Sequence, residues 1–174
     1  RQRQMCIRDR RWAMEAVGLN YDTMRDESPF EISGGQKRRV AIAGVLALRP
    51  SYLILDEPTA GLDPHGRDEI LKTVRKLYDD NPDMTIILVK HSMEDIAEQA
   101  NRIIVVDKGR LVMDGTPHAI FARRKELEAI GLTVPQVTQL MQRLREAGLA
   151  LDDSAITVEE AVTALSAYLN GKEA

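Results

Sequence analysis

The chain has 174 residues, of which 44% are hydrophobic and 29% charged, a composition typical of a globular domain that can bury a core. The net charge of −3 disfavours a protein that binds nucleic acid through a broad basic surface. No apolar run approaches the roughly 18–20 residues of a membrane span, and the single cysteine, Cys6, cannot form a disulfide within the chain.

The first ten residues carry four arginines and show neither helical nor strand periodicity. We therefore expect residues 1–10 to be a disordered or foreign leader that takes no part in the fold. A short helix is expected from Arg11 to Leu19, followed by a polar connector over residues 21–30.

A Ser-Gly-Gly-Gln sequence opens the next expected helix. Ser33 stands at the N-cap and Gln36 follows three residues later, which is the spacing of a capping box. Gly34 and Gly35 each cost a helix roughly 1 kcal/mol relative to alanine. Close approach of an anion such as phosphate to the exposed amides would compensate for this cost, and the alternative is an ordinary glycine turn. The buried stripe of this helix is expected to be Val40, Ala43, Leu46 and Ala47.

Two adjacent acids follow an apolar strand. Residues 52–55 are all apolar, which is typical of a strand buried on both faces of a parallel sheet. Asp56 and Glu57 lie at its C-terminal end, where such sheets bind ligands. Because neighbouring strand residues point to opposite sides, one acid can bind Mg²⁺ while the other orients a water. The alternative is a solvated acidic turn.

A second strand ends at a histidine. After the first strand, Asp63 and Pro64 are expected to begin a helix that runs to about Tyr78. Residues 85–90 then form another buried strand, and His91 follows it at the edge of the sheet where Asp56 and Glu57 are expected. This position favours a functional role for His91 over a structural one.

The last third of the chain changes from strands to helices. Residues 103–106 and 111–113 are expected to pair through a tight turn, and only helices are indicated from about Lys125. Thr133 and Thr157 are expected to cap two helices, which are too few to make a strong core alone and should dock on the sheet or on a second copy. Their expected buried residues are Val137, Leu140, Met141 and Leu144 in the first, and Val158, Val162, Leu165 and Leu169 in the second.

In combination these segments resemble the motifs of ATP-binding-cassette ATPases, in the family's order and spacing over residues 11–118. Residues 33–36 resemble the signature motif, residues 53–58 the Walker B strand, residues 60–64 the D-loop, and His91 the switch histidine. The resemblance implies an α/β, P-loop NTPase-like parallel sheet with flanking helices, incomplete at the N-terminus. It also implies three parts: a leader (1–10), a partial ATPase domain (11–124) and a C-terminal helical extension (125–174).

The resemblance extends to one subfamily of these ATPases. Residues 28–47 are similar to the ATPase subunits of energy-coupling factor transporters, and residues 132–140 and 156–161 resemble their C-terminal extension. Residues 56–64 suit the second of the two paired subunits. The resemblance implies an importer of vitamins or transition-metal ions at the cytoplasmic face of the membrane. Its implied partners are a second ATPase subunit, a transmembrane coupling protein and a substrate-binding membrane protein.

The resemblance also implies roles for individual residues, with ATP and Mg²⁺ as cofactors. Glu57 would polarise the attacking water, His91 would contact the γ-phosphate and Asp56 would hold Mg²⁺ through water. Asp63 would bridge the two subunits. The signature residues would bind ATP held by the partner subunit, and these are Ser33, Gly34, Gly35 and Gln36.

The chain departs from the family pattern in one respect. It contains no Gly-x-x-x-x-Gly-Lys-Ser/Thr phosphate loop and no glutamine loop. We therefore expect a C-terminal fragment that hydrolyses no ATP alone and that exposes apolar sheet edges where a strand between 85–90 and 103–106 would lie. The alternatives are a non-transport cassette ATPase, for which no coiled-coil insertion or basic face is seen, and a non-catalytic dimerisation module.

Overall fold

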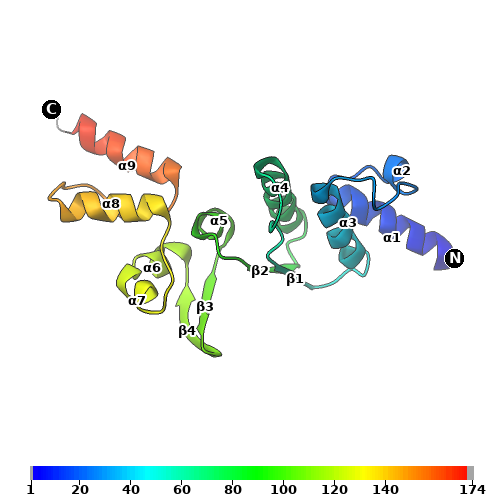
Figure 1. Ribbon diagram of the computed structural model, residues 1–174, viewed down its shortest axis with the longest axis horizontal. Coiled ribbons are helices and arrows are strands. Elements are labelled where there is room, and N and C mark those ends of the chain that lie inside the picture. Colours follow the sequence, from blue (N-terminus) through cyan, green and yellow to red (C-terminus); the bar gives the residue numbers. More distant parts are fainter. Residues whose placement is uncertain (1, 172–174) are drawn as a thin grey trace. The chain divides into compact units, whose positions relative to one another are not determined.

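The computed structural model describes residues 2–171 (Figure 1). The chain divides into two compact units, residues 1–89 and residues 90–174, and each unit has its own hydrophobic core. The boundary falls directly after the second strand, within the segment that we expected to form one ATPase domain.

The first unit contains four helices and a two-stranded parallel sheet among its described residues. Its elements are α1 (Gln2–Ala16), α2 (Tyr21–Met24), α3 (Gly34–Leu46), β1 (Tyr52–Asp56), α4 (Pro64–Asp80) and β2 (Thr85–Val89).

Helix α1 begins at Gln2, so the expectation that residues 1–10 lack regular structure is wrong from residue 2 onward. Arginine, glutamine, methionine and alanine are strong helix formers, and the C-terminal half of the helix packs on the core through Ala13. Asp9 also forms an ion pair with Arg49 at 3.4 Å. The assignment of residues 1–10 as a foreign leader stays a prediction.

The β1–β2 sheet buries one face only. Leu53 and Leu55 pair with Ile86 and Leu88, and these four residues pack into the core of the unit. Helix α4 contributes Ile70, Val74 and Leu77 to the same core. On the opposite face Tyr52 is 70% exposed and Ile54 is 65% exposed, so the expectation of a strand buried on both faces is wrong here.

Helix α3 matches its expected start but not its whole expected stripe. Ala43 and Leu46 are buried as expected, whereas Val40 is 38% exposed and Ile42 takes its place in the core. The helix turns its Ile42 side toward α1 and α4 because it packs against both of them.

The second unit contains a β-hairpin and five helices among its described residues. Its elements are α5 (Met93–Gln99), β3 (Ile103–Asp107), β4 (Arg110–Gly115), α6 (Pro117–Phe121), α7 (Arg124–Ala129), α8 (Gln136–Glu146) and α9 (Val158–Asn170).

The hairpin and the C-terminal helical segment share one core. Val105 and Met113 of the hairpin pack in the same buried cluster as Phe121, Leu127 and Ile156. The C-terminal segment therefore docks on the hairpin of its own unit, which is one of the two arrangements that we expected.

Several details of α8 and α9 differ from expectation. Pro135, not Thr133, precedes α8, and no side chain caps that helix. Figure 1 shows α8 and α9 side by side, and they pack through a small cluster that includes Met141 and Ala161. Half of the expected apolar residues pack in this cluster, namely Val137, Met141, Leu144 and Leu165. The other half are exposed: Leu140 by 51%, Val158 by 64%, Val162 by 57% and Leu169 by 60%.

Within residues 2–171 no helix combines the length and the apolar composition needed to cross a membrane.

Candidate functional site

The signature turn has the predicted capping box at the start of α3. The Gln36 backbone N–H donates to the Ser33 hydroxyl oxygen at 3.2 Å, and the Ser33 backbone N–H donates to the Gln36 side-chain oxygen at 2.8 Å. These two reciprocal bonds fix the direction in which the first turn of α3 points.

The two glycines of this turn differ, because Gly34 is exposed whereas Gly35 is buried against Glu69 and Gly66 of α4. Neither lies in the left-handed region. A Cβ on Gly34 would lie 3.5 Å from Leu62, and one on Gly35 would lie 3.7 Å from Glu69, both ordinary van der Waals distances. The first N–H groups of a helix have no partner within the helix. Close approach of an external anion to the first turn therefore explains Gly34 better than internal packing does, whereas Gly35 lies in the contact with α4.

The two acids differ in environment. Asp56 is the last residue of β1 and is exposed, whereas Glu57 is half-buried. Glu57 adopts φ 43°, in the left-handed region, and its N–H donates to the Val89 carbonyl at 3.0 Å. A non-glycine residue held in this conformation costs of order 1–3 kcal/mol, and such strain clusters at functional sites.

The acids fit a Mg²⁺ ion that is shared with a ligand. Mg²⁺ is usually bound by one or two carboxylates together with waters and substrate phosphates, and the exposed carboxylate of Asp56 can supply one such ligand. Among the side chains that the structure describes, residues 7–171, no group of three or more His, Cys, Asp or Glu is arranged to enclose a metal ion.

The D-loop lies against the signature turn. Asp63 caps α4 as predicted, because its Oδ1 accepts from the Gly66 N–H at 2.8 Å. Leu62 reaches Gly34, and Gly66 lies opposite Gly35, at 3.7 Å from the position of a Cβ there. The structure thus brings residues 33–36 and Asp63 together in one unit.

His91 lies on a turn that is fixed on both sides. It is exposed, and the next residue, Ser92, caps α5 by accepting from the Asp95 N–H at 3.3 Å. The preceding residue, Lys90, forms an ion pair with Asp95, and the two side chains are only 2% and 3% exposed. Because His91 belongs to the second unit and Asp56 and Glu57 to the first, their expected juxtaposition at one sheet edge stays a prediction.

Three polar links near the site were not foreseen from the sequence. They are the contact of Arg38 with the Ala60 carbonyl, the ion pair of Arg39 with Glu69, and the ion pair of Lys90 with Asp95. The first two span 22 and 30 residues of sequence, so local spacing carried no signal for them. The third lies within five residues and could have been suspected from a lysine beside a buried strand.

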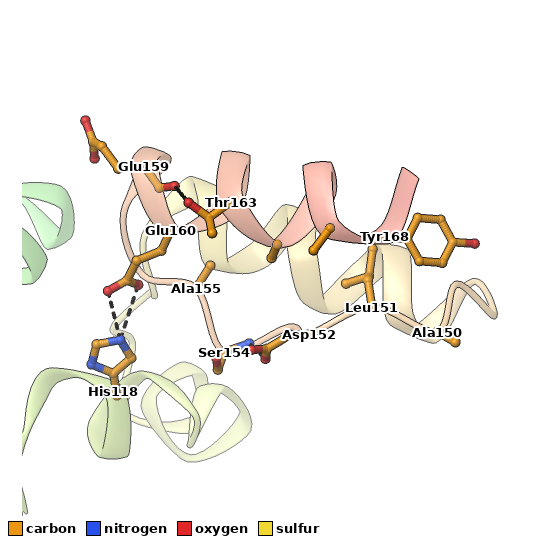
Figure 2. A pocket seen from close by; sticks show the side chains of 12 residues that line it. His118, Ala150, Leu151, Asp152, Ser154, Ala155, Glu159, Glu160, Thr163 and Tyr168 are labelled. Carbon is orange, nitrogen blue, oxygen red and sulfur yellow. Dashed lines mark hydrogen bonds and ion pairs between the residues drawn. The ribbon is translucent and has the colours of Figure 1, made fainter. Parts of the chain in front are cut away.

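The second unit holds a cavity of about 790 Å³ beside α9 (Figure 2). At one end His118 Nε2 lies 3.1 Å from Glu160 Oε1. Burial by itself raises the pKa of Glu160, but the Ile156 N–H at 2.8 Å and the His118 ring together lower that pKa below its usual value. Tyr168 lies at the other end of the cavity. None of the predicted nucleotide-site residues lines it.

Comparison with known proteins identifies the relatives of this chain. The family model described as "ABC transporter" matches residues 4–60. The energy-coupling factor transporter ATP-binding protein EcfA2 of Clostridium tetani is 54% identical over 160 residues, which are 92% of this chain and 55% of that protein. The EcfA2 protein of Clostridium perfringens is also 54% identical, over 88% of this chain and 53% of that protein.

The chain is a homologue of the ATP-binding proteins of energy-coupling factor transporters. The structure of cbiO1 from Clostridium perfringens, described as part of the ABC transporter complex cbiONQ, matches with a TM-score of 0.59 and 34% identity. This match covers 78% of the present chain and 53% of cbiO1. The predicted resemblance to energy-coupling factor ATPases and the P-loop NTPase-like α/β fold are both confirmed.

The chain spans about half the length of the curated relatives that it matches, 55% of the first and 53% of the second. The family model begins at residue 4 and therefore includes part of the segment that we expected to be a foreign leader.

Proposed function

We propose that this chain is part of an ATP-hydrolysing subunit of an energy-coupling factor importer and that its signature turn serves ATP bound by a partner subunit. The observation that carries the proposal is the first turn of α3, where Gly34 is exposed and nothing in the chain requires a glycine at that position. The names of the relatives, which describe energy-coupling factor ATP-binding proteins, support the same proposal.

Each residue of the site then has a distinct role. Ser33, Gly34, Gly35 and Gln36 would bind the γ-phosphate of the ATP held by the partner, and Asp63 would bridge the two subunits. On the chain's own nucleotide side, Asp56 would hold Mg²⁺ through water, Glu57 would polarise the attacking water and His91 would contact the γ-phosphate. The magnesium ion would neutralise charge on the transferred phosphoryl group.

Positioning is the main contribution of the protein in this chemistry. Phosphoryl transfer depends on alignment and on charge stabilisation more than on covalent chemistry. The strained backbone of Glu57 and the doubly fixed turn of His91 both hold a side chain in a set direction. A phosphate loop would have to come from outside the 174 residues, because none occurs among them.

The proposed complex lies at the cytoplasmic face of the membrane. Its further members would be a second ATPase subunit, a transmembrane coupling protein and a membrane protein that selects the cargo, a vitamin or a transition-metal ion. The cbiO1 structure supports this proposal because it is described as part of a transporter complex.

A second candidate is a non-catalytic assembly module built on α9. The exposed apolar residues Val158, Val162 and Leu169 favour it, since they lie on the outside of the helix. Light scattering on the chain would distinguish it, because a dimer that persists without nucleotide and is lost in Val162→Glu would favour the assembly module.

The proposal can be tested by complementation. The partner is cbiO1 of Clostridium perfringens with an inactivating replacement in its own signature motif, mixed with the present chain and ATP–Mg²⁺. If the present chain supplies a working signature turn, ATP turnover by the mixture should exceed that of the inactivated partner alone. Gly34→Asp in the present chain should abolish the gain, because a carboxylate on the exposed first turn of α3 would repel the phosphate.

Gly44→Asp is the matched control, since Gly44 lies exposed in the same helix with no atom within 4 Å of a Cβ. It should restore turnover as the unsubstituted chain does. The proposal fails if Gly34→Asp and Gly44→Asp restore turnover equally.

A further inference from the structure

A hydrogen bond connects the signature helix to the D-loop. Arg38 lies in the second turn of α3, and its guanidinium Nη2 donates to the Ala60 carbonyl oxygen at 3.1 Å. A guanidinium is a rigid planar donor, so it constrains a carbonyl more strongly than the flexible ammonium group of a lysine.

Two further contacts join α3 to α4, the helix that follows the D-loop. Arg39 forms an ion pair with Glu69 of α4 at 3.2 Å, and its side chain is only 13% exposed. The backbones of Gly35 and Gly66 also approach closely, since a Cβ on Gly35 would lie 3.7 Å from the Gly66 Cα. The starts of α3 and α4 are therefore packed together. The D-loop leads directly into α4, and Arg38 of α3 binds the first residue of that loop, Ala60.

The D-loop is exposed at Ala60 and Gly61, whereas Leu62 packs against the core of the unit and Asp63 caps α4. Within the loop the Ala60 N–H donates to the Glu57 carbonyl at 3.0 Å and the Leu62 N–H donates to the Thr59 carbonyl at 3.3 Å, which is long for such a bond. Gly61, between them, adopts φ 72° and has no atom within 4 Å of a Cβ. Arg38 binds the carbonyl of Ala60, which directly precedes Gly61.

We propose that Arg38 is a positioning residue that holds the D-loop on the signature helix, so that residues 33–36 and Asp63 move as one body. This inference rests on the proposed function, in which the signature turn binds the partner's ATP and Asp63 reaches the subunit boundary. When the signature turn moves toward a bound phosphate, Arg38 moves the D-loop in the same direction. Glu57, which precedes the D-loop in the chain, moves with it.

The first test uses the chain alone and does not depend on nucleotide. Hydrogen exchange is measured at the Ala60 and Leu62 amides in the unsubstituted chain, in Arg38→Met and in Lys37→Met. Arg38→Met should speed exchange at both amides by about 3- to 10-fold, the effect of one net hydrogen bond on a local opening equilibrium. Amides in α4 should exchange as before.

Lys37→Met is the matched control because it removes an exposed cation from the same helix one residue earlier. It should leave both amides unchanged. Equal exchange in Arg38→Met and the unsubstituted chain would overturn the inference, and so would faster exchange throughout the first unit, which would indicate a loss of general stability.

The second test uses the complementation mixture. Arg38→Met should lower kcat by about 10-fold or more while KM for ATP changes by less than about twofold, because it misplaces groups without removing a phosphate contact. Arg38→Lys should restore part of kcat. Unchanged kcat in Arg38→Met overturns the inference. If the unsubstituted chain itself restores no turnover, the proposed function fails, while the exchange measurement still decides whether Arg38 holds the D-loop.

Discussion

Arg39 and Glu69 form an ion pair between α3 and α4 in which the two partners are unequally exposed, 13% for the Arg39 side chain and 37% for that of Glu69. The pair joins the helix that begins with the signature turn to the helix that follows the D-loop. The difference in exposure predicts that the two partners do not contribute equally to stability.

We expect Glu69→Gln to destabilise the chain more than Arg39→Met. The first leaves a largely buried guanidinium without its countercharge, which costs about 1–3 kcal/mol, whereas the second leaves a carboxylate that water can reach. Urea unfolding would measure both. Asp79→Asn, in the exposed pair with Arg75, is the control and should change the free energy of unfolding by less than about 0.5 kcal/mol. Equal losses for all three variants would contradict the expectation.

The cap of α4 depends on a glycine. A Cβ on Gly66 would lie 2.8 Å from the Asp63 Oδ1 that accepts the Gly66 N–H. Gly66→Ala should therefore displace the cap and cost about 1–2 kcal/mol in thermal unfolding. Gly44→Ala, within α3 and free of neighbours, should instead stabilise by about 0.5–1 kcal/mol because alanine favours a helix. A stabilising Gly66→Ala would show that Asp63 does not cap α4.

The ion pair of Lys90 with Asp95 is almost entirely buried. Lys90→Met should destabilise the chain by about 3 kcal/mol or more, because it removes the cation from beside a carboxylate that is 3% exposed. Lys108→Met, at an exposed hairpin position, is the control. A loss of less than about 0.5 kcal/mol in Lys90→Met would mean that the pair does not fix the turn that carries His91.

The stability of the second unit should depend on pH through Glu160. The pKa of Glu160 in the folded chain lies below its ordinary value of 4.5. A lowered carboxyl pKa contributes stability that is fully present above pH 4.5 and is lost as the pH falls through the folded value. Urea unfolding followed from neutral pH to below pH 4.5 should therefore show a loss that is smaller in Glu160→Gln.

The neighbouring Glu159→Gln is the control for this measurement, because Figure 2 shows its carboxylate directed away from His118. It should keep the acid dependence of the unsubstituted chain. His118→Ala should reduce the dependence in part, since the Ile156 N–H still binds Glu160. An unchanged dependence in Glu160→Gln would contradict the assignment.

The sequence predicted the parts of the site that depend on local chemistry. The capping box of Ser33 and Gln36 and the Asp63 cap both follow from residue types at fixed spacing, and the structure has both of them. The order of strands and helices from Tyr52 onward was also predictable, because short apolar runs alternate with amphipathic helical segments.

Burial was harder to predict than secondary structure. An apolar run does not show which side of a strand is covered, so Ile54 was expected in the core and is 65% exposed. Similarly, α9 packs through the side that carries Ala161 and leaves Val162 outside, although valine is the more apolar residue. Such choices depend on neighbouring elements that periodicity does not identify. For the same reason, periodicity does not predict long-range contacts such as the hydrogen bond from Arg38 to the Ala60 carbonyl.

The central claim is that the chain serves ATP held by a partner and has no complete nucleotide site of its own. ATP turnover by the purified 174-residue chain, with and without Glu57→Gln, tests it most directly. The account predicts that neither protein releases phosphate above the buffer rate. Robust turnover by the unsubstituted chain that Glu57→Gln abolishes would contradict it, because it would show that these residues bind and hydrolyse ATP without a phosphate loop.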